Sequence, residues 1–231
     1  MPIQCVTFDL DDTLWSIYPV IDRAEAKFLE WVEEHLPRIA GDFTAQTLST
    51  HRHQYFKQYP ELHHDLSQLR KNWIAHLMTE HGYTIDKVDD GFEVFWRERN
   101  TLELFDHAEN VLNRVNKRFR TGAVTNGNAD LHQIGIHHYF DFYLTSAQVG
   151  NSKPHPAIFD ATVSQAQCRP DQILHVGDDP TRDVLGANRA GMRTVWVNLK
   201  DAEWQENIRP DVTITDIADL PDAIDRLIAS L

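Results

Sequence analysis

Short apolar runs alternate with longer amphipathic segments over most of this chain. The apolar runs, rich in β-branched and aromatic residues, predict strands at Ile3–Leu10, Phe119–Thr125, Phe140–Ser146, Ile173–Gly177, Thr194–Asn198 and Val212–Thr215. Helical periodicity lies between most of them. Strands that alternate with helices predict an α/β fold, in which a parallel sheet has helices on both faces. Such sheets bind ligands beyond the carboxyl ends of their strands.

One long interval breaks this alternation. Between the first two predicted strands, the periodicity is helical and predicts helices at Asp22–His35, Thr44–Tyr59, Asp65–His81, Val88–Arg99 and Ala108–Asn116. The last of these helices belongs with the sheet. We therefore expect residues 18–100 to form an all-helical inserted domain, and residues 1–17 and 101–231 to form the sheet domain. An insertion that begins just after the first strand is placed to cover a site at the end of that strand and to keep water out of it.

The composition indicates a globular protein of a reducing compartment. A chain of 231 residues is long enough for one α/β domain with an insert. Its two cysteines, Cys5 and Cys168, give no disulfide framework, so we expect a cytoplasmic location. The first residues lead directly into a strand, and we expect no signal peptide.

Charge and hydropathy narrow the range of partners. The formal net charge of −13 argues against binding to nucleic acid, because nucleic-acid-binding proteins usually carry basic clusters. No stretch approaches the roughly 18 consecutive apolar residues of a membrane span, so we expect no membrane partner either. An anionic substrate would need a locally positive site. The sequence leaves no readable mark of the oligomeric state.

Candidate chemistry begins at the end of the first predicted strand. Side chains alternate between the two faces of a strand, so Asp9 and Asp11 should project to the same side, two residues apart. Two like charges held this close repel each other. Such a pair is typical of a site where a cation lies between the carboxylates, or where one of them carries a proton or attacks a substrate.

Three later segments carry complementary groups at strand ends or before a helix. Thr125 and Asn126 end the second strand with a hydroxyl and an amide, Lys153 precedes a proline, and Asp178 and Asp183 follow a fourth strand. Carboxylates suit Mg²⁺, which prefers oxygen ligands. Hydroxyl, amide and ammonium groups suit a phosphoryl group. Together the segments predict phosphoryl transfer, in which positioning and charge neutralisation supply most of the catalysis.

In this order and spacing, the four segments resemble the motifs of the haloacid dehalogenase-like hydrolase superfamily, and specifically of its phosphatases. The matching residues are Asp9, Asp11 and Thr13, then Thr125, then Lys153, then Asp178 and Asp183. The resemblance implies a Rossmann-like parallel sheet core with an inserted helical cap of the C1 type. It also implies an enzyme that uses Mg²⁺ to hydrolyse a small-molecule phosphomonoester, such as a nucleotide, a flavin precursor or a sugar phosphate.

The resemblance further implies a role for each matching residue. Asp9 would attack phosphorus and form an aspartyl-phosphate, and Asp11 would act as the general acid and base. The metal would be held by the Asp9 carboxylate, the Asp11 backbone carbonyl and the Asp178 carboxylate. The phosphoryl group would be bound by Thr125, Asn126 and Lys153.

Neighbouring residues would support this site from behind. Thr13 would orient the loop that carries Asp9, and Asp183 would orient Lys153 or a metal-bound water. Asp12 is expected to cap the following turn. For Asp179 two interpretations stay open: it reaches the metal or a water, or it starts the next helix.

Alternative functions use similar parts. A 2-haloacid dehalogenase of the same superfamily attacks carbon without a metal, but its position matching Asp11 is not an acid. A phosphomutase has motifs that do not separate it from a phosphatase. A non-catalytic, phospho-accepting signalling module has its acidic residues in a different order, in a shorter chain without a helical insertion. The order of motifs in this sequence therefore favours a phosphatase.

The predicted insertion is also rich in histidine. Six of these residues fall within thirty-odd positions: His51, His53, His63, His64, His76 and His81. A second metal site is one interpretation of this cluster, but the spacings do not repeat a ligand pattern. We favour the interpretation that they lie on solvated helix faces.

Overall fold

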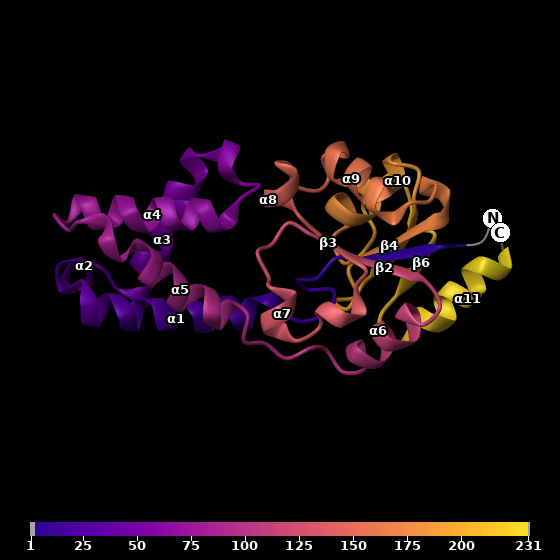
Figure 1. The fold of residues 1–231 in the computed structure, drawn as a ribbon, viewed down its shortest axis with the longest axis horizontal. Coiled ribbons are helices and arrows are strands. Elements are labelled where there is room, and N and C mark those ends of the chain that lie inside the picture. Colours follow the sequence, from indigo (N-terminus) through magenta and orange to yellow (C-terminus); the bar gives the residue numbers. More distant parts are fainter. Residues whose placement is uncertain (1–2, 231) are drawn as a thin grey trace. The chain divides into compact units, whose positions relative to one another are not determined.

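A six-stranded parallel sheet forms the centre of one part of the molecule (Figure 1). The computed structural model describes residues 3–230, so residues 1, 2 and 231, at the ends of the predicted sheet domain, lie outside the described residues. The strands are β1 (Cys5–Phe8), β2 (Arg120–Thr125), β3 (Phe142–Thr145), β4 (Ile173–Gly177), β5 (Arg193–Val197) and β6 (Val212–Ile214). The predicted α/β fold is confirmed. Each strand lies inside its predicted run, except that β5 begins one residue earlier.

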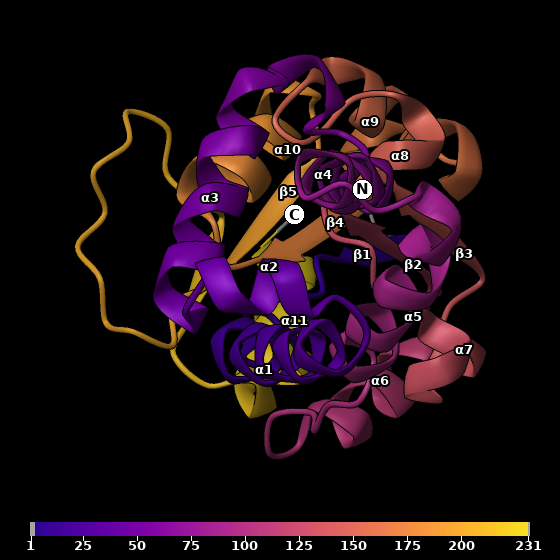
Figure 2. The ribbon, with the colours of Figure 1, turned by 90° about the vertical axis from the view of Figure 1, so that its left-hand side faces the viewer.

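Helices cover both faces of this sheet (Figures 1 and 2). One face carries α9 (Pro156–Ala166) and α10 (Gly186–Arg189), and the other carries α6 (Ala108–Asn116) and α11 (Leu220–Ser230). A short helix, α8 (Ser146–Val149), follows β3, and a π-helical turn, η5 (Pro180–Leu185), follows β4. Phe142, Ile158 and Phe159 belong to the apolar core between the sheet and α9. This burial on both faces explains why the strands read as nearly continuous apolar runs.

The order of strands places Asp9, Thr125 and Asp178 at the carboxyl ends of three neighbouring strands. The order is β3-β2-β1-β4-β5-β6, and Phe8 of β1 is in register with Ala123 of β2 and Val176 of β4. The chain moves from β1 to β2 and β3 on one side and then returns to β4 on the other. This reversal makes the carboxyl ends of β1 and β4 a topological switch point, where open parallel sheets bind ligands.

Five of the helices between β1 and β2, together with one short helix after β2, form a second compact unit. It comprises Ile17–Leu102 together with Asn128–Ile134, whereas the sheet unit runs up to Ser16, continues over Glu103–Gly127 and resumes at Gly135. Its helices are α1 (Ile17–His35), α2 (Pro37–Asp42), α3 (Ala45–Gln58), α4 (Leu66–Glu80), α5 (Val88–Arg99) and α7 (Leu131–Ile134). Its own apolar core is centred on the aromatic side chains of Phe28, Trp31 and Trp73.

The predicted helices in this unit agree closely with the observed ones, because their caps are readable. Thr44 and Thr47 form a reciprocal capping box at the start of α3, and the Asp65 side chain accepts a hydrogen bond from Gln68 N at the start of α4. The short helix α2 is absent from our prediction, and α1 begins five residues before the predicted start at Asp22. Across both units, the described residues also include five single turns of 3₁₀ helix, at Pro60–Leu62, Ile85–Lys87, His137–Tyr139, Pro170–Gln172 and Ile217–Asp219.

The segment 128–134 is the main departure from the predicted domain boundaries. The sequence pattern assigns it to the sheet domain, but it packs with the helical unit. Asn128 bonds to Ser67 and Trp96, and Asp130 N donates to Asn100 Oδ1 at 2.7 Å. These bonds join residues about thirty to sixty positions apart, and local periodicity carries no information about them.

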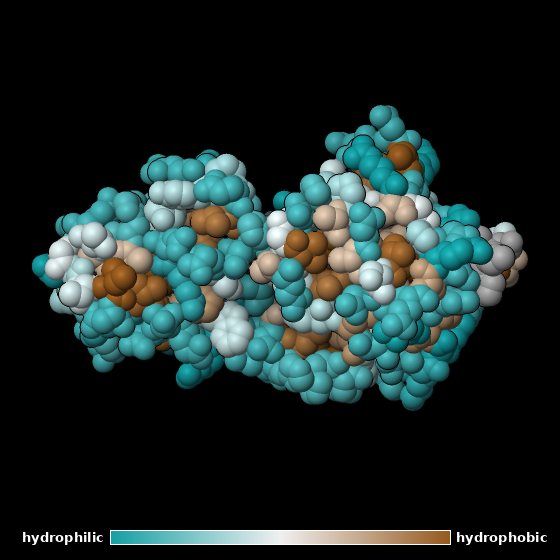
Figure 3. Space-filling view, turned by 45° about the horizontal axis from the view of Figure 1, so that its top comes forward, coloured by the Kyte–Doolittle hydropathy of each residue, from teal (hydrophilic) through white to brown (hydrophobic). Residues whose placement is uncertain are grey.

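Most of the surface seen in Figure 3 is hydrophilic, with small, separate apolar patches. Within residues 3–230, no helix has the length and apolar character that crossing a membrane requires.

Candidate active site

A buried lysine lies at the centre of the predicted site. Lys153 is only 3% exposed, and its Nζ donates to Asp9 Oδ1 at 2.5 Å, to Asp183 Oδ1 at 2.6 Å and to Val124 O at 2.8 Å. These contacts use all three donors of an ammonium group. The structure therefore brings together Asp9, Lys153 and Asp183, which lie on three separate segments of the sequence.

The loop that carries Lys153 is held by Asn126. Lys153 N donates to Asn126 Oδ1 at 2.7 Å, and Asn126 Nδ2 donates back to Lys153 O at 2.9 Å. The peptide bond between Lys153 and Pro154 is cis. Both polar atoms of the Asn126 side chain thus bind the Lys153 backbone. Binding of a phosphoryl group by Asn126 stays a prediction, and what the structure shows is a side chain that positions Lys153.

Thr125 ends β2 beside this loop, as the sequence predicts. It is buried, and its Oγ1 accepts a hydrogen bond from Gly127 N at 2.9 Å. This bond turns the chain sharply at the end of the strand, where backbone N–H groups can face a ligand. The predicted contact between Thr125 and a phosphoryl group is not tested by the structure.

Three carboxylates meet beside Lys153. One oxygen from each of Asp9, Asp178 and Asp183 lies within 4.8 Å of the others. Thr13 Oγ1 lies between two of them, 3.5 Å from both Asp9 Oδ2 and Asp178 Oδ1. Because three carboxylates face one ammonium, negative charge is in excess, and the oxygen donors suit a hard divalent cation. The group fits the predicted metal site at Asp9 and Asp178.

Burial and neighbouring negative charges raise the pKa of two acids in this cluster. Burial, reinforced by the charges of Asp183 and Asp178, raises the pKa of Asp9 well above its usual range. Burial, reinforced by Asp183, Asp12 and Asp179, raises the pKa of Asp178 to about 7. Both acids are thus costly to ionise without a counter-charge, which a cation would supply.

Asp183 and Lys153 stabilise each other as an ion pair. Burial alone would raise the pKa of Asp183, but the ammonium of Lys153 and the hydrogen bond from His175 outweigh it and hold this pKa below its usual range. Burial would likewise lower the pKa of Lys153, and the carboxylates of Asp183 and Asp9 outweigh it and raise this pKa. The pair therefore stays charged, and Asp183 is committed to Lys153, as its predicted supporting role requires.

Asp11 is held by an aromatic neighbour that the sequence did not lead us to expect. Trp15 Nε1 donates to Asp11 Oδ1 at 2.8 Å, and the Trp15 side chain is fully buried. A tight loop makes this contact possible, because Asp12 adopts a left-handed conformation with φ of 59° and Asp12 N donates to Trp15 O at 2.7 Å. The Asp11 carboxyl group is thus fixed in orientation. The predicted binding of metal by the Asp11 carbonyl stays a prediction.

A second unexpected residue lies beneath the site. His175 is in β4, directly opposite Thr7 of β1, and is 1% exposed. Its Nε2 lies 3.1 Å from Asp183 Oδ1, and its Nδ1 lies 2.9 Å from Thr7 Oγ1. Burial lowers the pKa of His175 despite the charge of Asp183, so a neutral ring donates from Nε2 and accepts at Nδ1. A single histidine within an otherwise apolar strand is the sequence signal for this contact.

Asp179 caps the turn that follows β4, and Gly177 leaves room for a side chain of this turn. The Asp179 side chain accepts hydrogen bonds from Thr181 N at 2.9 Å and Arg182 N at 2.7 Å, so it starts the η5 turn. These bonds agree with the interpretation in which Asp179 starts the next helix, and its contact with a metal or a water stays a prediction. A Cβ at Gly177 would lie 2.3 Å from Asp183 Cγ, so Gly177 makes room for the Asp183 carboxylate.

Comparisons with known proteins identify the family of this chain. Residues 3–191 match the sequence profile of the haloacid dehalogenase-like hydrolases. The chain is 30% identical to the 5-amino-6-(5-phospho-D-ribitylamino)uracil phosphatase YigB of Escherichia coli (strain K12), over 96% of each protein. It is also 30% identical to the phosphoserine phosphatase of Thermus thermophilus, over 65% of this chain and 63% of that protein.

A solved structure is similar over nearly the whole chain. The crystal structure of a 2-haloacid dehalogenase from Pseudomonas syringae pv. Tomato DC3000 superposes with a TM-score of 0.90 and 36% sequence identity, covering 97% of this chain and 99% of that one. The profile match and the full-length relatives together confirm the predicted family. The chain belongs to the haloacid dehalogenase-like hydrolase family and is a hydrolase of that family.

Proposed function

We propose that this chain is a Mg²⁺-dependent phosphatase that hydrolyses a small-molecule phosphomonoester through an aspartyl-phosphate. The observation that carries the proposal is the buried arrangement of Lys153 against Asp9 and Asp183, with Asp178 beside them. It combines a nucleophile, a fixed cation and an excess of carboxylate oxygens in one place. Phosphoryl transfer needs all three, because its transition state spreads negative charge over the phosphoryl oxygens.

In the first half-reaction, a carboxylate oxygen of Asp9 attacks phosphorus and the bond from phosphorus to the ester oxygen breaks. Asp11 gives its proton to that oxygen, so the leaving group departs as an alcohol. Trp15 holds the Asp11 carboxyl group in place by its bond to Oδ1. Lys153 stabilises the phosphoryl oxygens through its positive charge, and the Thr125 turn binds them.

In the second half-reaction, water attacks the phosphorus of the aspartyl-phosphate. Asp11, now ionised, takes a proton from this water, and inorganic phosphate leaves with Asp9 restored. Asp9, Asp178 and the backbone carbonyl of Asp11 would hold Mg²⁺, which supplies neutralisation of charge on the phosphoryl oxygens when bound. Asp183 keeps Lys153 charged and in place throughout.

The relatives support a phosphatase and indicate the scale of the substrate. The names of the E. coli and T. thermophilus relatives each designate a phosphatase that acts on a small phosphorylated molecule. Nucleotides, flavin precursors and sugar phosphates are the substrate classes we propose, with the helical unit as a cap. The two free cysteines, Cys5 and Cys168, fit a reducing compartment such as the cytoplasm.

Dehalogenation is the second candidate, because the similar P. syringae structure carries that name. In that reaction the carboxylate of Asp9 would displace halide from carbon, and no acid would be needed to protonate a leaving oxygen. Here Asp11 is present and oriented by Trp15, and Asp178 adds a carboxylate beside Asp9. These two acids favour the phosphatase.

The decisive experiment measures both reactions with the same purified protein. We expect Mg²⁺-dependent release of phosphate from an aryl phosphate, and no halide release from 2-chloropropionate. Asp9→Asn should lower phosphatase activity by at least about a thousandfold, because the nucleophile is lost, and chelation of Mg²⁺ should abolish it. Asp11→Asn should cost about a hundredfold or more, the usual contribution of a general acid. Halide release without phosphate release would overturn the proposal.

A further inference from the structure

His175 is a buried residue of the sheet unit that the proposed mechanism does not use. It interrupts the apolar run of β4, and a purely packing role would suit an apolar side chain better. Burying a polar group costs free energy unless the group is hydrogen-bonded. Both ring nitrogens of His175 have partners within hydrogen-bond distance. The ring is therefore part of a polar network beneath the candidate site.

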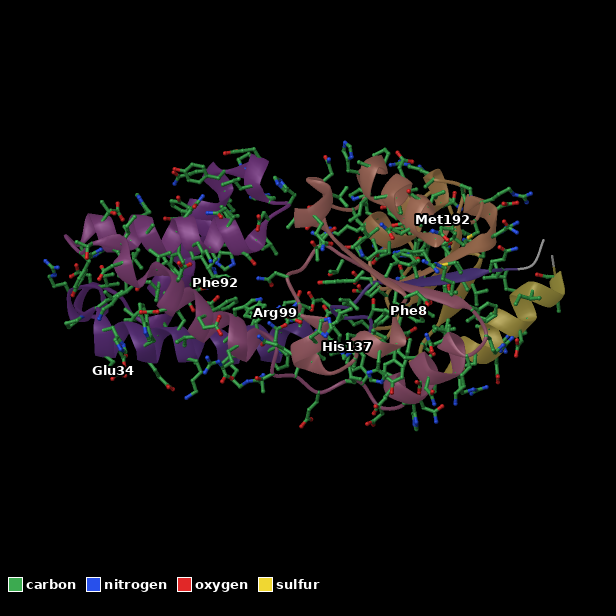
Figure 4. The ribbon with its side chains drawn as sticks, in the orientation of Figure 1. Phe8, Glu34, Phe92, Arg99, His137 and Met192 are labelled. Atoms are coloured by element: carbon green, nitrogen blue, oxygen red, sulfur yellow. The ribbon has the colours of Figure 1, made fainter. Side chains whose placement is uncertain are left out.

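The hydrogen bonds of the ring run in one direction. His175 Nε2 lies 3.1 Å from Asp183 Oδ1, and an ionised carboxylate only accepts hydrogen bonds, so Nε2 carries the proton. A neutral ring then accepts at Nδ1, where the Thr7 hydroxyl donates to it at 2.9 Å. Thr7 is fully buried in β1, an inner strand of the sheet, on which Figure 4 labels the next residue, Phe8. The network thus leads from Thr7 through His175 to Asp183.

Packing holds the imidazole ring in this orientation. The ring of Phe159, in α9, meets the His175 ring nearly at a right angle, with centroids 5.9 Å apart and planes inclined by 89°. Gly186 lies so close to Phe159 that a Cβ there would be 2.6 Å from its ring, so Phe159 has little room to move. The hydrogen bond from Thr7 and the contact with Phe159 together restrain the imidazole from turning away from Asp183.

The bond from His175 goes to the same carboxylate oxygen that binds the lysine. Asp183 Oδ1 accepts from Lys153 Nζ at 2.6 Å as well as from His175 Nε2. Asp183 Oδ2 accepts from Asp179 N at 3.1 Å. Because both oxygens are bonded to groups on separate segments, the carboxylate cannot rotate without losing one of these bonds. A fixed Asp183 in turn fixes the ammonium of Lys153, whose other carboxylate partner is Asp9.

We propose that His175 is a positioning residue for the phosphatase reaction, because its Nε2–H group holds the Asp183 carboxylate against the Lys153 ammonium. The proposal rests on the proposed phosphatase function. Lys153 stabilises charge on the phosphoryl oxygens only while its ammonium stays beside the nucleophile, Asp9. His175 acts through Asp183 alone. What the site requires of His175 is therefore a hydrogen-bond donor at the position of Nε2, and not an imidazole that accepts or releases protons during the reaction.

Two substitutions at His175 separate the N–H group from packing. We expect His175→Leu, which has no donor, to lower kcat for an aryl phosphate about tenfold. His175→Gln offers an amide N–H to Asp183 and should keep kcat within about threefold of the wild type. A packing role predicts the reverse order, because leucine is the better apolar replacement in a buried strand. Higher activity in His175→Leu than in His175→Gln would therefore overturn the proposal.

The two threonines beside His175 provide a matched pair of variants that leaves the imidazole in place. The sheet aligns His175 with Thr7 of β1 and with Thr194 of β5, and both threonines are fully buried. The Thr7 hydroxyl bonds to the ring, whereas the Thr194 hydroxyl accepts from Asp211 N at 3.3 Å. We expect Thr7→Val to lower kcat about three- to fivefold, the scale of one hydrogen bond, and Thr194→Val to leave it nearly unchanged. Equal losses in the two variants would contradict the network.

A measurement without substrate separates this inference from the phosphatase proposal. Nitrogen NMR of protein with isotope-labelled histidine and lysine should show His175 with a proton on Nε2 and none on Nδ1. The signal of the buried Lys153 ammonium should shift in His175→Leu and stay near its wild-type position in His175→Gln. A proton on Nδ1, or a Lys153 signal that His175→Leu leaves unchanged, would overturn the inference even in an active phosphatase. If the NMR results are as expected but no phosphate ester is hydrolysed, His175 still positions Lys153 and the phosphatase proposal fails.

Discussion

Two regions of this molecule each gather three potential metal ligands whose ligand atoms lie within 4.8 Å of one another. In the sheet unit the ligands are Asp9, Asp178 and Asp183, and in the helical unit they are His51, His76 and Glu80. By distance alone the two groups are equivalent. Their surroundings differ, and the difference decides which of them suits a cation.

The carboxylate group is buried and has more negative charge than its surroundings balance. Asp183 is satisfied by Lys153 and His175, whereas burial raises the pKa of Asp9 and of Asp178. A divalent cation relieves that cost directly. The cluster therefore favours a cation, because Lys153 supplies one positive charge against three carboxyl groups.

The histidine group has suitable ligand atoms, but His51 carries its proton on the nitrogen that would have to bind the metal. Trp73 Nε1 donates to His51 Nδ1 at 3.0 Å, so a neutral His51 carries its proton on Nε2, the atom that faces Glu80. A metal-bound histidine normally uses one nitrogen for the metal and donates a proton from the other. The Trp73 donor prevents this arrangement. Proximity of ligand atoms thus indicates a metal site only when the remaining atoms of each ligand face suitable partners.

Among the variants that compare the two groups, Asp178→Asn should have the largest effect. This change removes a carboxylate from the buried group, and we expect the affinity for Mg²⁺ to fall by at least about a hundredfold. Isothermal titration with Mg²⁺ measures this without any substrate. Asp12→Asn is the matched control, because Asp12 pairs with Lys200 and lines a neighbouring pocket with Asp178. We expect that variant to keep its affinity within about fivefold, and equal losses in both variants would count against Asp178 as a ligand.

A smaller effect is expected for Asp183→Asn. Lys153 would lose one of its two carboxylates and keep Asp9, so we expect a destabilisation of up to about 3–5 kcal/mol, which is what breaking a buried ion pair costs. We expect kcat to fall about 10- to 100-fold and chemical denaturation to show the lower free energy of unfolding.

An exposed ion pair provides the control for Asp183. Asp171 pairs with Arg169 at 2.8 Å on the surface, and Asp171→Asn should leave kcat and the melting temperature nearly unchanged. If Asp183→Asn behaved like Asp171→Asn, the buried pair would not be what holds Lys153 in place.

The smallest effect is expected in the helical unit. His76→Ala should leave Mg²⁺-dependent activity unchanged and the free energy of unfolding within about 0.5 kcal/mol, as for most exposed positions. The measurement is steady-state turnover with a melting curve. Tight Zn²⁺ binding by the wild type that disappears in His76→Ala would show that our interpretation of the histidine group is wrong.

Trp73→Phe tests the same comparison in the other direction, because this variant should bind a cation more tightly than the wild type does. Without the indole donor, His51 can keep its proton on Nδ1 and offer Nε2 to a cation. We expect Zn²⁺ binding to strengthen by about five- to tenfold relative to the wild type, the scale of one hydrogen bond. The double variant Trp73→Phe, His76→Ala should lose that gain, and its persistence would place the ion elsewhere.

The strands and most of the helices could be predicted because they follow from local sequence patterns. The strand runs were readable because both faces of a parallel sheet are buried, and α3 and α4 because Thr44 and Asp65 cap them. Asp9, Lys153 and Asp183 were identifiable because each follows a strand or precedes a helix at a characteristic spacing. Their convergence then follows from the parallel topology.

The remaining features depend on contacts that no local pattern encodes. His175 joins the site because β4 pairs with β1 in a register that aligns it with Thr7. Asn126 binds the backbone of a loop 27 residues away, whereas its residue type alone suggested a ligand contact. A sequence identifies side-chain chemistry, but which partner a side chain satisfies is decided by the tertiary structure.

The connectivity of the helical unit limits which segments can be exchanged between related proteins. The chain crosses between the two units four times, after Ser16, Leu102, Gly127 and Ile134. The helical unit is therefore not one continuous insertion, because it is built from two separate segments of the sequence. A chimera that replaced only residues 17–102 would leave Asn128 and Asp130 without the partners that Ser67, Trp96 and Asn100 now supply. Recombination between relatives should succeed only when both segments are inherited together.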